Sequence, residues 1–311
     1  MIIIENTSDF NGQFHTIVTI GTFDGVHLGH KKIINKLIDS TKDNDFKTTI
    51  LTFFPHPRMV LQQNTDLKLI TTLDEKKDIL EKAGLDQLVV YPFTKDFSRL
   101  TALQFVRDIL VEQLHVKKVI IGYDHRFGRN RTATIKDLIE FGDLFNFEVE
   151  QISAEELNEV SISSTKIRNA LHEGDIETAN AFLGYSFMIT GTVTRGKGLG
   201  KKIEFPTANL HVEEPYKLIP KNGVYVVESK MMNKTVYGMM NIGFNPTVNG
   251  TEKTIEVHFF DLNKDLYDQK IQVTLLKRLR DEKRFDSIDA LKNQLNIDRE
   301  NALSYVQKRS N

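Results

Sequence analysis

The sequence contains no cysteine. This absence excludes disulfide bonds, a thiol nucleophile and zinc or iron–sulfur sites with cysteine ligands, and it is typical of proteins in a reducing cytoplasm. Long apolar runs are missing too, since no stretch approaches the roughly 20 residues that a membrane-spanning helix needs. Residues 2–4 (III) are too few for the apolar core of a signal peptide. We therefore expect a cytoplasmic protein that does not bind membranes.

The chain also lacks an excess of charge of either sign. Its 41 Lys and Arg residues nearly balance 42 Asp and Glu residues, which gives a formal net charge of -1. This balance provides no general attraction to nucleic acid or to an anionic membrane. Low-complexity segments and internal repeats are absent as well. With 311 residues, 40% of them hydrophobic, the chain is long enough for about two domains.

Strands and helices alternate in the first half of the chain. Apolar, β-branched runs predict strands, and apolar residues at helical spacing predict helices. The expected strands are residues 16–20, 48–54, 87–91, 118–122 and 147–152, and the expected helices are residues 73–83, 102–114 and 135–145. Repeated strand–helix–strand units predict an α/β domain in which helices cover both faces of a parallel, Rossmann-like sheet. Ligands of such sheets bind at the carboxyl ends of the strands.

The pattern changes after an expected helix at residues 176–183, which ends at Gly184. The strands expected beyond this point are residues 187–194, 223–229, 236–242, 254–261 and 271–279. Short strands at this spacing predict an antiparallel barrel or sandwich. Asp286 or Ser287 is a candidate N-cap for a C-terminal helix. We therefore expect a first domain at residues 1–184 and a second, mainly β domain at residues 185–311.

The first expected strand leads into residues 21–30 (GTFDGVHLGH), a glycine-rich turn before a helix. Free backbone N–H groups at the N-terminus of a helix stabilise a phosphate, and Gly21 lets the backbone approach a ligand closely. His27 and His30 share a face of the first helical turn, so both imidazoles can donate hydrogen bonds to phosphate oxygens. The simpler interpretation is a pair of solvated histidines, but the strand-to-helix context favours a phosphate site.

Three further polar segments belong to the first half. Residues 55–58 (PHPR) and 123–128 (YDHRFG) directly follow expected strands, so both should lie at the same edge of the sheet as the histidine turn. Residues 162–168 (ISSTKIR) predict a serine-capped helix that carries Arg168 about one turn in. A guanidinium group is well suited to phosphate, although a serine cap beside a basic residue is also a common structural feature.

The second half carries a different set of polar motifs. Backbone amides and ammonium groups of residues 196–202 (GKGLGKK) can surround phosphates, unless this is a flexible basic surface loop. Thr207 and Asn209 are two residues apart in extended chain and point the same way, and their oxygens suit Mg²⁺. In residues 255–259 (IEVHF), Glu256 and His258 face the side opposite to the apolar residues, where a strand glutamate is usually just solvated.

These motifs together resemble the bacterial bifunctional riboflavin kinase/FMN adenylyltransferase family, also called FAD synthetases. The resemblance covers nearly the whole chain in the order of the family. It is carried by residues 21–30, 54–57, 122–128, 162–168, 206–209, 241–247 and 256–258. The Pro-Thr-Ala-Asn segment with a downstream Glu-x-His is specific to the kinase domain, whereas many nucleotidyltransferases share the His-x-Gly-His turn.

The resemblance implies a Rossmann-like nucleotidyltransferase domain followed by an antiparallel riboflavin-kinase barrel with a C-terminal helix. It also implies two reactions: riboflavin and ATP give FMN and ADP, and FMN and ATP then give FAD and pyrophosphate. Mg²⁺ would be the cofactor, and nucleic acid would not be a partner. Two alternatives stay open, namely an enzyme with only one active half and a non-catalytic protein that senses or stores flavin. Self-association is also left open.

The resemblance assigns roles to individual residues. In the kinase step a neutral ribityl hydroxyl must lose a proton, so Glu256 would be the general base. In the adenylyl step the FMN phosphate is already ionised, so positioning and charge neutralisation suffice. The implied residues of this second step are His27, His30, Ser164 and Arg168, with Gly21, Phe23, Asp24 and Asp124 at the nucleotide and Phe54, Tyr91 and Phe127 at the flavin. In the kinase domain Gly196, Lys197, Gly198 and Lys201 would bind phosphates, and Thr207 and Asn209 would bind the metal.

Two positions depart from the family pattern. Glu204 precedes Phe-Pro-Thr-Ala-Asn, where the family usually has glycine. This carboxylate would either weaken ATP binding or point outward. His125 stands where the first-domain motif often has an aromatic residue, which leaves the wall of the flavin or adenine pocket open at that point.

Overall fold

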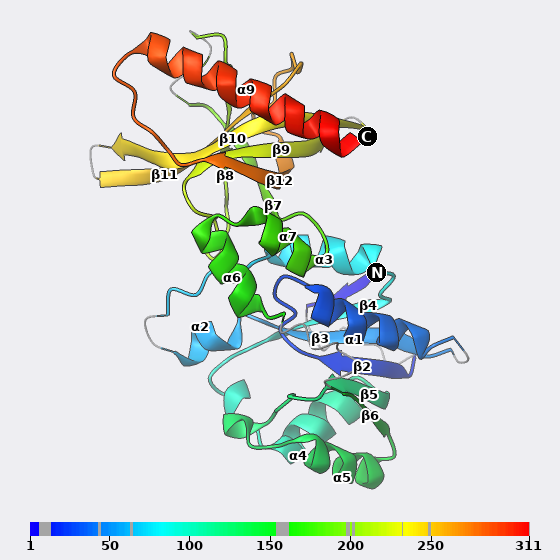
Figure 1. Ribbon diagram of the computed structural model, residues 1–311. Helices are drawn as coiled ribbons and strands as arrows, with labels where there is room; N and C mark the ends of the chain where they lie inside the picture. Colours follow the sequence, from blue (N-terminus) through cyan, green and yellow to red (C-terminus); the bar gives the residue numbers. More distant parts are fainter. Residues whose placement is uncertain are drawn as a thin grey trace. The chain divides into compact units, whose positions relative to one another are not determined.

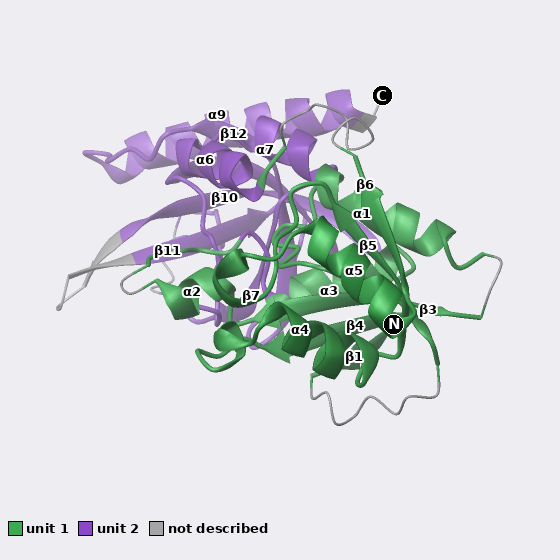
Figure 2. Cartoon of the chain, turned by 90° about the horizontal axis from the view of Figure 1, so that it is seen from below, with its two compact units in different colours: residues 1–69, 73–163 green, residues 70–72, 164–311 purple. Residues whose placement is uncertain are grey.

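The structure is a computed structural model of the 311-residue chain (Figure 1). It describes residues 1–5, 14–42, 45–62, 65–153, 162–196, 200, 203–231, 233–247 and 250–310. The chain forms two compact units, drawn in different colours in Figure 2. Unit 1 comprises residues 1–69 and 73–163, and unit 2 comprises residues 70–72 and 164–311.

Unit 1 contains a parallel sheet of six strands in the order β1-β4-β3-β2-β5-β6. The strands are β1 (Ile2–Ile4), β2 (Thr16–Ile20), β3 (Lys47–Phe54), β4 (Gln87–Pro92), β5 (Val116–Gly122) and β6 (Glu148–Ile152). The predicted parallel α/β sheet is confirmed, and β1 is an additional edge strand. Successive strands run outward from β2 to β4 on one side and from β5 to β6 on the other. The order therefore reverses between β2 and β5, the position at which such sheets bind ligands.

Helices cover both faces of this sheet because successive strand residues point to opposite sides. On one face, Ile17 belongs to a core cluster that includes Ile34 of α1 (Leu28–Asp39) and Leu80 of α3 (Leu73–Lys82). On the other face, Val18 packs in a cluster with Leu138 of α5 (Ile135–Phe145). Each buried aliphatic side chain contributes about 1.5–3 kcal/mol to stability.

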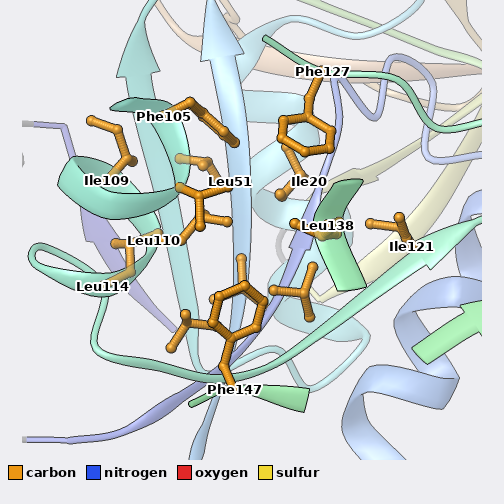
Figure 3. Packing of buried hydrophobic residues seen from close by; sticks show 14 of the residues in the cluster. Ile20, Leu51, Phe105, Ile109, Leu110, Leu114, Ile121, Phe127, Leu138 and Phe147 are labelled. Atoms are coloured by element: carbon orange, nitrogen blue, oxygen red, sulfur yellow. The ribbon is translucent and has the colours of Figure 1, made fainter. Parts of the chain in front are cut away.

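The expected helix at residues 102–114 begins as α4 (Ala102–Gln104) and continues as a π-helical segment, η3 (Phe105–Val111). Figure 3 shows how the side chains of Phe105, Ile109 and Leu110 face Leu51 and Ile20 of the sheet. The helical segment thus closes one face of the sheet, as the apolar spacing predicted. Among its described residues, unit 1 also contains three short helical segments: α2 (Pro57–Leu61), η2 (Phe97–Arg99) and η4 (Arg129–Arg131).

Unit 2 is built on a closed antiparallel barrel, in the order β10-β11-β8-β7-β12-β9. Its strands are β7 (Met188–Thr194), β8 (Ala208–His211), β9 (Gly223–Met231), β10 (Lys234–Thr247), β11 (Gly250–Phe259) and β12 (Lys270–Arg280). The structure thus decides between the two predicted architectures in favour of a barrel. Ile255, Val257 and Phe259 are buried along β11, while Glu256 and His258 are half-buried on its other side, which is the predicted alternation.

The predicted C-terminal helix is α9 (Ile288–Ser310). Ala302 and Leu295 of α9 pack with Val226 and Met239 of the barrel strands. A buried ion pair joins the same elements, because Arg280 at the end of β12 donates to Asp298 at 2.7 Å. Breaking such a pair leaves a buried charge without compensation, so it fixes α9 on the barrel.

Two shorter helices, α6 (Ser164–Glu173) and α7 (Ile176–Leu183), also belong to unit 2 by their contacts. Asn180 of α7 donates from Nδ2 to the carbonyl of Leu275 in β12 at 3.0 Å, and its Oδ1 accepts from the backbone N–H of Phe187. The connection between α7 and the first barrel strand is therefore part of the barrel unit. Among the described residues, no helix combines the length and the hydropathy that crossing a bilayer requires.

Candidate active sites

The first candidate site is the turn between β2 and α1, at the point where the strand order reverses. Phe23, Gly25 and Val26 adopt positive φ angles of 46°, 81° and 35°. Glycine tolerates this region, but a β-branched residue such as Val26 rarely adopts it. Backbone strain of this kind costs about 1–3 kcal/mol per residue and clusters at functional sites. The strained turn therefore points to function at residues 21–30.

His27 caps the helix that follows the turn. Its Nδ1 accepts a hydrogen bond from the backbone N–H of His30 at 3.4 Å. A neutral imidazole whose Nδ1 accepts carries its proton on Nε2, so Nε2 is the donor atom of the His27 ring. His27 is only 6% exposed and its ring stacks on that of His30 at 3.6 Å between centroids. Interpreting His27 as a solvated histidine is therefore wrong.

His30 lies between the rings of His27 and Phe23, whose centroid is 5.0 Å away. Its Nδ1 is buried and has no hydrogen-bond partner among the described residues. Burial lowers the pKa of His30 well below its usual value, and the nearby His27 and Lys76 lower it further. The ring is neutral at pH 7, so it can offer a phosphate a hydrogen bond but no positive charge.

A buried positive charge at this turn comes from Lys76, which sequence reasoning missed. Lys76 lies on α3, is 6% exposed, and donates from Nζ to the carbonyl of Thr22 at 2.7 Å. Burial lowers the pKa of Lys76 to about 8, although the charge of Asp24 raises it. The sequence did indicate that Lys76 is buried, because Lys76 follows Leu73 by three residues and precedes Leu80 by four. That spacing places it on the apolar face of α3.

A pocket of about 450 Å³ adjoins the turn at Gly21 and Thr22. Its aromatic lining residues are Phe53, Phe93, Phe97, Phe105 and Phe127, and its basic ones include Arg58, Arg126 and Arg131. Flat apolar walls next to guanidinium groups suit a planar ring system that carries a phosphate. The pocket and the histidine turn together form one candidate site within unit 1.

Only one of the three aromatic residues predicted to bind flavin lines this pocket, namely Phe127. Phe54 packs against the core cluster beneath α1 and α3. Tyr91 lies against Phe97, at 4.8 Å between ring centroids, outside the set of lining residues. Phe53 lines the pocket in place of Phe54, because neighbouring strand residues point to opposite faces. The sequence offered no means of choosing between these two adjacent phenylalanines.

His125 continues the aromatic wall. Its ring lies nearly parallel to that of Phe127, with 22° between the planes and 6.2 Å between centroids. Burial and the charge of Arg131 lower the pKa of His125 to about 4, although Asp124 raises it. The imidazole is therefore a neutral, flat ring at pH 7. This departure from the family pattern preserves the flat wall of the pocket.

The remaining predicted residues of the adenylyl site lie on separate elements. Asp124 is exposed just beyond the carboxyl end of β5. Ser164 is the first residue of α6, and Arg168 is half-buried one turn later. Since α6 belongs to unit 2, a shared site of Ser164 and Arg168 with the histidine turn stays a prediction.

The second candidate site lies on the barrel. Glu256 of β11 is directly opposite Asn209 of β8 and Asn241 of β10. Residues that face each other on neighbouring strands have their side chains on the same side of the sheet. The hydroxyl of Thr207 donates to Glu256 Oε2 at 3.3 Å. The structure thus brings together Glu256, Thr207 and Asn209, as predicted, and adds Asn241 to the row.

His258 supports this row from the same strand. Its Nδ1 lies 2.8 Å from the carbonyl oxygen of Pro206, which fixes the backbone beside Thr207. Its ring contacts Phe205 and Phe260, at 5.1 and 5.9 Å between centroids. Burial lowers the pKa of His258, so the imidazole is neutral at pH 7. His258 is therefore a support for the site rather than a source of charge.

The glycine-rich loop begins and ends beside the same residues. A Cβ at Gly196 would collide with the side chain of Asn209, and one at Gly200 would collide with the carbonyl of Phe205. Only glycine therefore lets the backbone lie this close to Asn209 and Thr207. The other phosphate-binding residues predicted in this loop, Lys197, Gly198 and Lys201, lie outside the described residues.

Glu204 points away from this row and pairs with Lys292 of α9. That ion pair is the first cause of the lowered pKa of the Glu204 carboxyl. Its φ of 68° lies in the left-handed region, which glycine adopts without strain. This conformation gives a physical reason for glycine at the same position in the family. Of the two outcomes considered for Glu204, the structure supports the outward-pointing one.

A second pocket, of about 250 Å³, opens beside Thr207. Besides Thr207 it is lined by Pro206, Val257, Phe259 and the segment 262–267. Within the described part of the chain, no group of three His, Cys, Asp or Glu side chains could hold a metal ion. The oxygen atoms of Thr207, Asn209 and Glu256 fit Mg²⁺, which prefers few protein ligands together with water and phosphate oxygens.

Comparisons with known proteins match two regions of the chain. The family model described as FAD synthetase matches residues 11–166, and the model described as riboflavin kinase matches residues 183–306. A relative from Buchnera aphidicola, named bifunctional riboflavin kinase/FMN adenylyltransferase, is 38% identical over 97% of this chain and 97% of its own. A relative of the same name from Listeria monocytogenes is 36% identical, over 97% and 96% of the two chains.

Among solved structures, a chain from Streptococcus pneumoniae described as a macrolide-efflux protein matches with a TM-score of 0.86. It is 31% identical, and the match covers 96% of this chain and 97% of that one. The match supports the two-unit fold, and the efflux activity in the name is said of that protein alone. The chain described here belongs to the family of bifunctional riboflavin kinases/FMN adenylyltransferases.

Proposed function

We propose that this chain converts riboflavin to FAD in two steps, each at its own site. The barrel phosphorylates riboflavin with ATP, which gives FMN and ADP. The sheet unit then transfers the adenylyl group of a second ATP to FMN, which gives FAD and pyrophosphate. Both activities follow from the family and from the two matched regions. We assign residues 1–184 to the adenylyl step and residues 185–311 to the kinase step.

The kinase step needs a base because its nucleophile is a neutral hydroxyl. Glu256 is the carboxylate that accepts this proton as the ribityl oxygen attacks the terminal phosphate of ATP. Thr207, at 3.3 Å from Glu256, and Asn209, opposite it, hold the nucleotide phosphates together with Gly196, Lys197, Gly198 and Lys201. Mg²⁺ bound at Thr207 and Asn209 would neutralise phosphate charge. The pocket beside Thr207 is where we place the base of ATP.

The adenylyl step needs no base because the FMN phosphate is ionised at neutral pH. Its oxygen attacks the α-phosphate of ATP in line, and pyrophosphate leaves. Nε2 of His27 and the neutral ring of His30 donate hydrogen bonds to phosphate oxygens, while Ser164 and Arg168 add donors and charge. The nucleotide site is formed by Gly21, Phe23, Asp24 and Asp124. The aromatic pocket takes the flavin, with Phe127 as a wall and Tyr91 behind the lining, whereas Phe54 lies on the other face of the sheet.

The remaining proposals concern the cellular location of the protein and its partners. The lack of cysteine and the balanced charge favour a cytoplasmic enzyme whose partners are small molecules rather than nucleic acid or membranes. A second copy of the chain is the one macromolecular partner left open.

The observation that carries the proposal is the placement of Glu256 beside Thr207 and Asn209. A binding protein has no use for a base at that position. The test is to incubate the pure protein with riboflavin, ATP and Mg²⁺ and to separate the flavins by chromatography. FMN followed by FAD is the expected result. Formation of FMN without FAD, or of FAD only when FMN is supplied, would identify a chain with one active half. If neither product formed, a flavin-storage protein would be favoured.

A further inference from the structure

Lys76 is a buried lysine to which the two proposed reactions assign no role. It lies on α3, away from residues 21–30 in the sequence, and only 6% of its surface is exposed. Burying an ammonium group is costly unless nearby groups compensate for the lost water. The contacts of Lys76 should therefore explain why a lysine is buried at this position.

The main contact of Lys76 is with the backbone of the histidine turn. Its Nζ donates to the carbonyl of Thr22 at 2.7 Å, and the hydroxyl of Thr52 donates to the same oxygen at 3.2 Å. Thr22 immediately precedes Phe23, the first of the residues with positive φ. The two donors therefore hold the turn at the point where its strained conformation begins. A hydrogen bond from a charged donor is about twice as strong as a neutral one, so Lys76 is the stronger of the two.

The charges around Lys76 link it to the imidazole pair. Asp24 in the turn favours the charged lysine. His30 on α1 is close enough for the ammonium charge to lower its pKa, and the ring of His27 stacks on that of His30. Glu75, the neighbour of Lys76 on α3, is also buried. One ammonium group thus contacts the turn and adds to the burial and to the charge of His27 that lower the pKa of the adjacent imidazole.

We propose that Lys76 is a positioning residue for adenylyl transfer, whose ammonium group holds Thr22 and the strained turn so that His27 faces the phosphates of ATP. This role rests on the proposed function of unit 1. Lys76 acts through the turn and does not itself touch the reacting atoms. Binding of the ATP polyanion next to this group further favours its charged form.

The test compares Lys76→Met, Lys76→Arg and a matched control, Lys82→Met, in the full-length chain. Lys82 is on the same helix and is exposed, so the control makes the same chemical change at a position away from the turn. We expect Lys76→Met to lower kcat/KM for FMN adenylylation by about 10²-fold, the scale of a misplaced reacting group. Lys76→Arg should retain more of this activity, and Lys82→Met should retain all of it.

The pH profile supplies a readout that a merely structural role would not change. The ammonium group is lost as pH rises through its pKa of about 8 in the free protein. The wild-type value of kcat/KM for ATP, which reports groups of the free enzyme, should therefore fall above that pH. Lys76→Met should lack this alkaline decline. NMR titration of the imidazole resonances should show the pKa of His30 rising in Lys76→Met, because a like charge has been removed, and staying low in Lys76→Arg.

Riboflavin phosphorylation by the same molecules serves as the internal control for folding. Unchanged kinase activity with impaired FAD formation supports the proposal. Wild-type kcat/KM together with an intact alkaline decline in Lys76→Met would overturn it, as would an unchanged pKa of His30. If the wild-type protein made no FAD from FMN, the proposed function of unit 1 would fail, and the His30 titration would still test the contact.

Discussion

Replacing Glu256 by glutamine should separate the two proposed reactions of this protein. The substitution preserves the shape of the side chain and removes only its ability to accept a proton. Glutamine can still accept the hydrogen bond that the Thr207 hydroxyl donates at 3.3 Å, through its amide oxygen. Loss of such a bond would in any case cost only about 1 kcal/mol. The barrel should therefore fold normally around Glu256→Gln.

The expected effect on catalysis is much larger. A correctly placed general base contributes about 10²–10⁴-fold, which corresponds to about 3–5 kcal/mol of activation free energy. Riboflavin phosphorylation should fall by this factor in kcat, with the KM for riboflavin little changed. FMN adenylylation should stay at the wild-type rate, because its nucleophile arrives ionised and its proposed residues do not include Glu256. Initial rates of both reactions, measured by separating the flavins at saturating ATP and Mg²⁺, give the comparison.

Glu228→Gln is the matched control for this experiment. Glu228 also lies on a barrel strand, β9, with its side chain 22% exposed, and it pairs with Arg309 at 3.6 Å. Removing this charge should leave both reactions intact. The reasoning would be refuted if Glu256→Gln kept its rate of FMN formation within about threefold of wild type, far below the contribution of a base. Equal damage to both reactions would also contradict it, because the two sites would then not be independent.

Three further substitutions test other parts of the structure. His27→Ala removes a donor to phosphate and the cap of α1, so FAD formation measured from FMN should fall by about 10²–10³-fold while FMN formation persists. Glu204→Gly relieves a positive φ and removes the exposed pair with Lys292, so both activities should stay within about twofold of wild type in steady-state assays. Asp298→Ala leaves Arg280 without its buried partner, so urea titration should show a loss of about 3–5 kcal/mol in the free energy of unfolding.

The helices whose bounds were predicted best have capping residues at their own ends. The predicted bounds of α7 agree with the structure because Asp175 caps its start, accepting from the backbone N–H of Thr178, and Gly184 ends it in the left-handed conformation. The bounds of α5 also agree, since Thr134 and Asp137 form a capping box at its start. Signals of this kind act within a few residues, so the sequence alone contains them.

Elements that depend on distant partners were harder to predict. The strand β8 (Ala208–His211) was missing from the expected barrel strands, because its polar residues show no apolar alternation. It is a strand because it pairs with β7 on one side and β11 on the other. The same registers place Asn241 next to Glu256, a neighbour that no spacing in the sequence could reveal. The contact of Lys76 with the turn could not be predicted for a similar reason, since its partner Thr22 is 54 residues away.

The electrostatic character of each site matches the nucleophile that it receives. In the proposed kinase step, the half-buried carboxylate of Glu256 would accept the proton that the attacking alcohol must lose. At the histidine turn, the pKa of His30 is lowered by burial, by His27 and by Lys76, and the charge of Asp24 acts on Lys76. A free carboxylate there would repel an FMN phosphate, whereas neutral N–H donors and a compensated ammonium group accept it. If the two sets of side chains were exchanged, both reactions should be lost. The alcohol would have no carboxylate to accept its proton, and the FMN phosphate would be repelled by a carboxylate.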